Sequence, residues 1–176
     1  ALDQGFKDSK QDVLQTVSES TTDVVLLQSI DDSDLHIAWS VAPNASYTNQ
    51  TGFQTITQSS TTSGHIVTRP TGQVPGAAVR FSVELKAGTK TEIVIHNDDV
   101  VSIGSRASFQ QSLTDTWQTV VWEYGPTSTD RFSLYFGLAD YQYTQSPGTY
   151  YLRNLRATQP DGIVVNFSQD VAITGQ

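Results

Sequence analysis

The chain of 176 residues contains no cysteine and no methionine. Without cysteine it cannot form a disulfide framework, use a thiol as a nucleophile or build a cysteine-based zinc site. Long apolar runs are also missing, because the longest, residues 24–27, has only four residues. A membrane-spanning helix needs about 20 such residues. We therefore expect no membrane span.

Charge is sparse and mostly negative. Charged residues make up 16% of the chain, and the net charge at pH 7 is -8. Such a surface repels a phosphate backbone instead of releasing counterions from it, so we expect no nucleic-acid partner. The chain has 19 Ser and 22 Thr, which predict a neutral surface rich in hydroxyl groups. Its length fits one globular domain with a sizeable core and one short additional segment.

The N-terminal segment has the only helical periodicity in the sequence. Between residues 3 and 20, apolar side chains recur on one face of a 3.6-residue period: Phe6, Val13, Leu14 and Val17. We assign residues 1–22 to a short amphipathic helical segment. Its apolar stripe is too narrow to be stable alone, so it should pack on the domain or on copies of itself. A frayed terminus is the alternative.

Residues 23–176 have a different pattern, with short β-rich runs separated by clusters of turn-forming residues at intervals of roughly 8–12 residues. This spacing predicts a β-sandwich or barrel. Apolar and polar residues alternate in runs that predict strands at 79–86, 91–96, 119–124, 131–138, 149–157 and 163–167. The first two are interpreted as a hairpin-like pair. Residues 42–63 are the least patterned and are predicted to form long loops over the sheet, where binding surfaces are often built.

Three motifs in the second half of the chain occur in a familiar order and spacing: RFSVELKAGT at 80–89, TWQT at 116–119 and GTYYLRNL at 148–155. They resemble the strands of jelly-roll carbohydrate-binding modules appended to xylanases and other polysaccharide-degrading enzymes. Related modules occur in bacteriophage tail and baseplate proteins. The resemblance covers about 80 residues and specifies the fold better than the ligand. It implies an all-β jelly-roll β-sandwich of two antiparallel sheets, assigned to residues 23–176 and preceded by the short N-terminal helix.

The resemblance also implies a function, with alternatives. The first hypothesis is a non-catalytic glycan-binding module for adhesion or targeting, located outside the cell, either secreted or on a virion surface. Its partner would be a polysaccharide or a cell-surface glycan. The alternative is a structural virion protein of a tail, baseplate or capsid decoration, in which the sandwich is a spacer or adhesin. In that case the N-terminal helix would dock to virion proteins or mediate self-association. A module appended to a secreted enzyme is a third version.

We expect no catalysis. Hydrolysis of a glycan needs two carboxyl groups about 5–9.5 Å apart, and the chain has only four Glu. A cross-strand pair of Glu84 and Glu92 is the best available arrangement. The histidines lack the spacing of a zinc site or a Ser-His-Asp triad, so His36, His65 and His96 are predicted to be ordinary surface or rim residues.

We also expect no cofactor. The resemblance implies a structural calcium, held in part by the Asp of an Asp-Asn pair in the closing strand, but this chain has Arg153-Asn154 there. A guanidinium cannot ligate a cation, so the substitution argues against that calcium. Two acidic clusters, Asp31-Asp32-Ser33-Asp34 and Asn97-Asp98-Asp99, could offer oxygen ligands to a hard cation. Both lie between predicted strands, where turn capping is the favoured interpretation.

Aromatic side chains are the better clue, because the apolar faces of sugar rings stack on them. Strand phase predicts that most are in the core: Phe81, Trp122, Tyr124, Phe132 and Phe136. The resemblance implies the same for Trp117, which matches a packing residue of the carbohydrate-binding modules. Tyr135 and Tyr151 have the opposite phase, and a loop at 139–147 contains further tyrosines. The predicted ligand-binding residues are Tyr135, Tyr141, Gln142, Tyr143, Tyr151 and Arg153. Tyr47 and Trp39 are weaker candidates, and Trp39 fits burial equally well.

Overall fold

A computed structural model describes residues 36–61, 64–99, 106–125, 132–138, 143 and 145–170. All of them belong to one compact unit, residues 33–176. The described residues contain no α-helix and one short 3-10 helix, Pro160–Gly162. Within this part of the chain, no helix has the length and hydropathy needed to cross a membrane. The helix predicted at 3–20 and the predicted boundary after residue 22 lie outside the described residues.

The strands form two large antiparallel sheets and one small one. The five-stranded sheet has the order β2 (Ser40–Val41), β5 (Ile66–Thr68), β10 (Phe132–Phe136), β7 (Glu92–Asp99) and β8 (Arg106–Ser112). The six-stranded sheet has the order β3 (Ala45–Gln50), β4 (Phe53–Gln58), β11 (Gly148–Gln159), β6 (Val79–Ala87) and β9 (Gln118–Tyr124), and β12 (Ile163–Val165) pairs with β11. In the small sheet, β1 (His36–Ile37) pairs with β13 (Gln169–Asp170). The predicted all-β architecture is confirmed.

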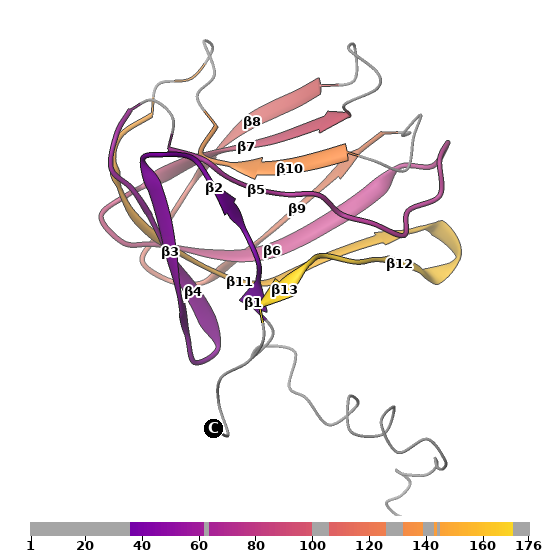
Figure 1. Cartoon of the computed structure of the whole chain (residues 1–176), viewed down its shortest axis with the longest axis horizontal. Coiled ribbons are helices and arrows are strands. Elements are labelled where there is room, and N and C mark those ends of the chain that lie inside the picture. The colour runs from indigo at the N-terminus through magenta and orange to yellow at the C-terminus, as the bar shows by residue number, and fades with distance from the viewer. Residues whose placement is uncertain are drawn as a thin grey trace, which may run out of the picture. The chain divides into compact units, whose positions relative to one another are not determined.

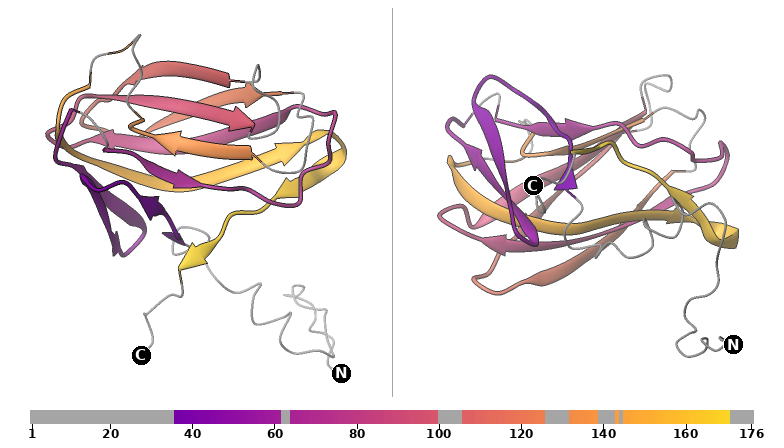
Figure 2. Two further views of the ribbon diagram at one scale, coloured as in Figure 1. Left: turned by 45° about the horizontal axis from the view of Figure 1, so that its top comes forward. Right: turned by 60° about the horizontal axis from the view of Figure 1, so that its bottom comes forward.

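The hydrophobic core lies between the two large sheets, which form the two layers visible in Figures 1 and 2. Alternation along each strand places one set of side chains inside. Phe81 of β6 and Phe132 of β10 are fully buried, and their ring centroids lie 6.0 Å apart in an edge-to-face contact. Phe81 also stacks on Trp122, at 5.1 Å and an interplanar angle of 13°. The contact between Phe81 and Phe132 joins the two layers. The predicted inner phase of β6 and β10 is confirmed.

The described part of the segment 42–63, residues 42–61, does not form long loops, contrary to the prediction. They include β3 and β4, which pair as an antiparallel hairpin through a turn at Thr51 and Gly52. The hairpin escapes pattern recognition because the buried phase of β4 contains glutamines, and Gln54 is only 2% exposed. Its amide accepts a hydrogen bond from Nε1 of Trp39 and donates one to the carbonyl of Ile37. A strand that buries hydrogen-bonded amides lacks the hydrophobic alternation on which the prediction relied.

The predicted hairpin of 79–86 and 91–96 is also wrong, because β6 and β7 belong to different sheets. The chain crosses between the layers at Gly88, where the backbone N–H donates to the carbonyl of Thr149 over 3.1 Å. A Cβ on Gly88 would lie 2.5 Å from that oxygen, so this crossing requires glycine. Alternation alone does not distinguish a hairpin from a crossing, because both strands present one apolar face to the same core.

Candidate functional site

Tyr135 lies on the outer face of the five-stranded sheet. Its neighbours along β10, Leu134 and Phe136, are fully buried, whereas Tyr135 is half-buried. The strand register places it opposite Val67 of β5 and His96 of β7, and His96 opposite Ser108 of β8. These residues form one row across the sheet, and we call this surface the Tyr135 face. The outward phase predicted for Tyr135 agrees with its burial.

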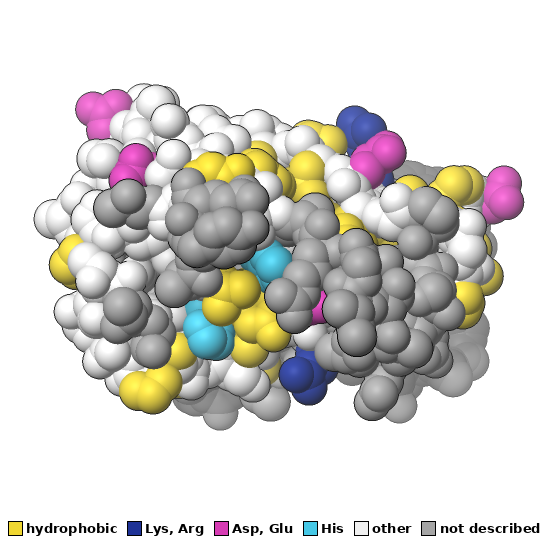
Figure 3. All heavy atoms as spheres, turned by 90° about the horizontal axis from the view of Figure 1, so that it is seen from above, with side chains coloured by type: hydrophobic (Ala, Val, Ile, Leu, Met, Phe, Trp, Pro, Cys, Tyr) yellow, Lys and Arg dark blue, Asp and Glu magenta, His cyan; other side chains and the backbone are white. Residues whose placement is uncertain are grey.

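Two histidines flank the Tyr135 ring. The ring centroids of His65 and His96 lie 5.3 and 5.4 Å from that of Tyr135, and both contacts are edge-to-face. Figure 3 looks onto this face and shows histidine and hydrophobic side chains next to each other. The histidines were predicted to be ordinary surface or rim residues. The structure instead brings both against the same aromatic ring, because strands distant in sequence are neighbours in the sheet.

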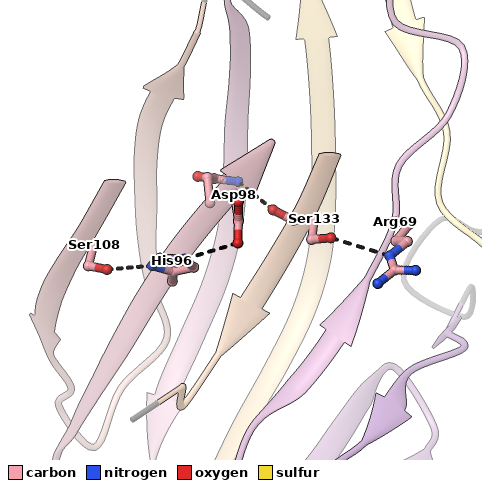
Figure 4. A network of polar contacts seen from close by, with 6 residues as sticks. Arg69, His96, Asp98, Ser108 and Ser133 are labelled. Carbon is pink, nitrogen blue, oxygen red and sulfur yellow. Dashed lines mark hydrogen bonds and ion pairs between the residues drawn. The ribbon is translucent and has the colours of Figure 1, made fainter. Parts of the chain in front are cut away.

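A network of polar contacts crosses the same strands (Figure 4). His96 is 6% exposed, and its Nδ1 lies 2.5 Å from Oγ of Ser108. Its Nε2 lies 4.0 Å from Oδ2 of Asp98. Ser133 of β10 lies opposite Asp98 in the strand register, and its Oγ accepts a hydrogen bond from Nε of Arg69 over 3.3 Å. The face therefore combines an aromatic ring with hydroxyl, imidazole, carboxylate and guanidinium groups.

The electrostatics of the row favour a neutral His65. Burial lowers the pKa of its imidazole, because the charged form loses solvation. At neutral pH the ring is therefore uncharged and offers one hydrogen-bond donor and one acceptor. Within the described residues, the hydroxyl of Tyr135 has no hydrogen-bond partner. Both groups can bind the hydroxyls of a neutral ligand.

Tyr143, from the predicted tyrosine loop, lies beside the Tyr135 face. Its hydroxyl donates to the backbone carbonyl of Ser108 over 3.4 Å, and the side chain of Ser108 contacts His96. Tyr141 and Gln142 lie outside the described residues. The predicted grouping of these three residues into one ligand surface stays a prediction.

A second cluster of aromatic residues lies on the outer face of the six-stranded sheet, which we call the Trp117 face. The ring of Phe53 lies 5.7 Å from that of Tyr151 and 6.1 Å from that of Trp117, with both contacts edge-to-face. All three side chains are half-buried. The prediction that Trp117 is a core residue is therefore wrong. Trp117 precedes β9 in the phase opposite to Val120 and Tyr124, whose side chains point inward.

Two cations contact the Trp117 ring. Cζ of Arg153 lies 4.1 Å from the ring centroid, and Nζ of Lys86 lies 5.8 Å from it. The same Nζ lies 5.7 Å from the centroid of Tyr151. Such distances are within the range of cation–π attraction. Tyr151 and Arg153 were both predicted to bind ligand, and they lie together here, on the opposite sheet from Tyr135.

Glu84 neutralises part of this positive charge. Its Oε1 accepts from Nε of Arg153 over 2.7 Å, and its Oε2 accepts from the amide of Asn154 over 3.0 Å. Burial raises the pKa of the Glu84 carboxyl, but the hydrogen bonds from Asn154 and Arg153 outweigh it, and the net pKa is lowered. The carboxylate is therefore ionised at neutral pH, with both oxygens engaged.

The residues at this position do not fit the calcium implied by the resemblance. The guanidinium of Arg153 occupies the place of the expected carboxylate ligand and has Glu84 and the Trp117 ring as partners. In the described part of the chain, no group of three or more His, Asp or Glu side chains could hold a metal ion.

The turn predicted at Asn97 and Asp98 is wrong, because both residues belong to β7. Asn97 accepts a hydrogen bond from Nε1 of Trp122, and residues 31–34 are outside the described part.

Glu84 and Glu92, the best arrangement of two carboxyl groups that the sequence offered, are not cross-strand neighbours, because β6 and β7 lie in different sheets.

The two weaker aromatic candidates, Trp39 and Tyr47, have structural partners. Trp39 is 7% exposed, packed edge-to-face on Phe136 at 5.6 Å. The Tyr47 hydroxyl donates to Oδ2 of Asp170 over 2.9 Å. Neither residue belongs to the Tyr135 face or to the Trp117 face.

Sequence reasoning missed several residues of the two faces, including His65, His96, Arg69, Lys86 and Phe53. A signal was present for His96 and Lys86, because each continues the polar phase of a predicted strand. No local signal places His65 or Phe53 beside a tyrosine from another strand. That proximity depends on the order of strands in the sheets.

No protein-family model matches the chain, and no curated protein matches it. Solved structures do match. A CBM4 carbohydrate-binding module has 18% identity and a TM-score of 0.51, over 70% of this chain and 77% of that one. The CBM1 of BiXyn10A has 12% identity and a TM-score of 0.53, over 73% and 94% of the two chains. A domain of the bacteriophage CBA120 tailspike protein 4 has 10% identity and a TM-score of 0.49, over 73% of this chain and 20% of that chain. At these identities the likeness shows the fold, and the chain has the β-sandwich fold of carbohydrate-binding modules.

Proposed function

We propose that this protein is a non-catalytic, extracellular glycan-binding module and that it binds a polysaccharide on the Tyr135 face. The observation that carries the proposal is the row of His65, Tyr135 and His96 across the outer side of the five-stranded sheet. Rings from β10, from β7 and from the residue that precedes β5 meet on a surface that also carries polar groups. A surface of this kind can bind the apolar and the polar side of a sugar at once.

The aromatic part supplies the apolar contact. Carbohydrate rings have faces of C–H groups, which pack against aromatic rings with favourable dispersion and electrostatics. Tyr135 is only half-buried, and its two imidazole neighbours hold the ring by edge contacts. A ring that is held in place loses little side-chain entropy on binding, which favours affinity.

The polar part supplies direction. Arg69 lies on the β5 side of Tyr135, where the fully buried Ser133 holds it, and Ser108 and Asp98 lie on the side of His96. Sugar hydroxyls both donate and accept, so a mixed set of donors and acceptors suits them. The fold gives coarse support, because the solved structures with this architecture include carbohydrate-binding modules. The ligand itself rests on the residues of the Tyr135 face.

The test is a glycan array on the full chain, followed by calorimetry with the best neutral glycan. Tyr135→Ala should weaken binding by at least about fivefold, comparable to the loss of other aromatic contacts. It should lower the free energy of unfolding by only about 1–2 kcal/mol, because the ring is half-buried. Tyr135→Phe, which keeps the ring, should retain most of the affinity.

The matched control is Tyr151→Ala, which removes a half-buried tyrosine from the other sheet. It should leave the neutral glycan bound. Equal loss of binding in both variants would contradict the assignment to the Tyr135 face. Binding to no glycan on the array, together with a stable multimer in light scattering, would contradict the proposal and favour a structural role in a virion.

A further inference from the structure

We infer that the Trp117 face is a second ligand site, which binds a polysaccharide containing hexuronate units. The inference goes beyond the Tyr135 site and does not depend on it. It starts from the charges around Trp117. The protein carries a net charge of -8, yet here two cations lie against one aromatic ring.

Within the described part of the chain, one carboxylate, that of Glu84, pairs with one of these two cations. Both oxygens of Glu84 are occupied, one by Nε of Arg153 and one by the amide of Asn154. Among the described residues, Lys86 has no carboxylate partner, and its Nζ contacts only the rings of Trp117 and Tyr151. The terminal nitrogens of Arg153 have no hydrogen-bond partner in the same part of the chain. The cluster therefore presents unused donors and an excess of positive charge.

The accessibility of these groups fits ligand binding. The Arg153 side chain is 33% exposed. The cation–π contacts hold both charged groups near the rings. The planar guanidinium and the neighbouring ammonium suit a carboxylate, which can accept hydrogen bonds from both. An anion would also relieve the repulsion between Lys86 and Arg153.

The aromatic rings specify a ligand that is more than an anion. Phe53, Tyr151 and Trp117 form one half-exposed apolar cluster directly beside the cations. A sugar ring with a carboxylate substituent has an apolar face for such a cluster and a negative group for the cations. Hexuronates have this combination, whereas neutral sugars lack the charge and simple anions lack the apolar face.

A groove extends the site along the sheet. It has a volume of about 360 Å³ and lies between Arg80 and Ser82 of β6 and Arg156 and Thr158 of β11. Glu84 lines the groove and also binds Arg153, so the groove begins where the aromatic cluster ends. Arg80 and Arg156 bring two further guanidinium groups to it, and Arg80 also pairs with Glu123 over 3.5 Å. A chain of several uronate units can therefore follow β6 and β11 instead of contacting one point.

The experiment titrates the full chain with hexamers of galacturonate, glucuronate and mannuronate. The same hexamers after reduction of their carboxyl groups serve as neutral ligands of equal length. At least one acidic hexamer should bind, about tenfold more tightly than its reduced form, with an affinity that falls as salt is raised. Absence of binding by all three acidic hexamers, or equal binding of acidic and reduced forms, would overturn the inference.

Variants locate the site. Lys86→Gln should weaken binding of the acidic hexamer by about fivefold or more, while its matched control Arg69→Gln, a loss of the same charge on the Tyr135 face, should not. Tyr135→Ala should also leave acidic binding unchanged. If Tyr135→Ala abolished acidic binding and Lys86→Gln did not, the anion site would lie on the Tyr135 face and the inference would be wrong.

Tryptophan fluorescence reports where the ligand binds, in addition to how tightly it binds. Trp39 is buried and Trp122 packs against the core, so Trp117 is the tryptophan that a ligand on this face would contact. Acidic hexamers should change the emission, and Trp117→Phe should remove the change while calorimetry still detects binding. A neutral glycan on the Tyr135 face should not change the Trp117 emission. Failure of the proposed function and failure of this inference are therefore distinguishable.

Discussion

The Tyr135 face and the Trp117 face both carry half-buried aromatic rings, but the charges beside these rings differ. On the five-stranded sheet, Tyr135 contacts two imidazoles, of which His65 is held neutral by burial. On the six-stranded sheet, Trp117 contacts an ammonium and a guanidinium. A half-buried aromatic residue therefore does not by itself specify a ligand. We expect the charge of the side chains on neighbouring strands to select it.

The two faces share one core, and breaking the core should have the largest effect. Phe81 is fully buried and contacts rings from both sheets. Phe81→Ala should lower the free energy of unfolding by about 3–5 kcal/mol, because it removes a buried ring and leaves a cavity. Both ligand surfaces should weaken together. Denaturant unfolding measures the loss.

Val121→Ala is the matched control for Phe81, since Val121 lies on the neighbouring strand β9 and is 45% exposed. Its effect should stay within about 0.5 kcal/mol. A loss below 1 kcal/mol in Phe81→Ala would show that the two sheets do not depend on a common core.

A buried amide should support the Trp117 face more than the Tyr135 face. Gln54 holds the β3–β4 hairpin against Trp39 and the carbonyl of Ile37, and the same strand begins with Phe53. Gln54→Ala leaves buried polar groups unpaired and should cost about 1–3 kcal/mol. Thermal unfolding measures the loss of stability. In glycan titrations, Gln54→Ala should weaken binding of the acidic glycan more than binding of the neutral glycan.

The control for this change is Gln111→Ala on β8, where the amide bonds only the adjacent carbonyl of Ser112. We expect almost no change in stability there. If Gln54→Ala weakened neutral-glycan binding as strongly as acidic-glycan binding, the two faces would be coupled through the hairpin.

The ion pair between Arg153 and Glu84 should contribute less. Both side chains are partly exposed, so a double-mutant cycle with Arg153→Gln and Glu84→Gln should give a coupling of about 0.2–1 kcal/mol. The lowered pKa of Glu84 makes this contribution depend on pH. It is fully present above the unfolded-state pKa and is lost as pH falls through the folded-state pKa. Unfolding curves between pH 7 and pH 3 should therefore lose this component in the wild type and not in Glu84→Gln.

The smallest effect is expected from His65, whose pKa is lowered by partial burial alone. Because the fold favours the neutral ring, the contribution is complete above the unfolded-state value of 6.5. It is lost as pH falls below that value towards the folded-state pKa. Denaturant midpoints at pH 7.5 and 5.5 should differ less in His65→Gln than in the wild type. His36→Gln, on the small sheet, is the control, and an identical reduction there would contradict the assignment to His65.

Strand phase could be predicted from sequence, and sheet membership could not. The alternation in β6, β9 and β10 correctly placed Phe81, Tyr124 and Phe132 inside. It could not show that β6 and β7 lie in different sheets, because a crossing and a hairpin have the same one-sided pattern. The β3–β4 hairpin was missed because Gln54 and Gln58 occupy its buried phase. Hydrogen-bonded amides in a core carry no hydrophobic signal.

By itself, the sequence determined the all-β class, the main core aromatics and the outward phase of Tyr135, since alternation is a local property of a strand. Tertiary structure alone decided which rings meet. It separated Tyr135 from Tyr151 onto opposite sheets, moved Trp117 to the surface beside Arg153, and placed His65 and His96 around one ring. These contacts join strands that are far apart in the chain. Their proximity follows from the order of strands in each sheet, which the pattern within any one strand does not contain.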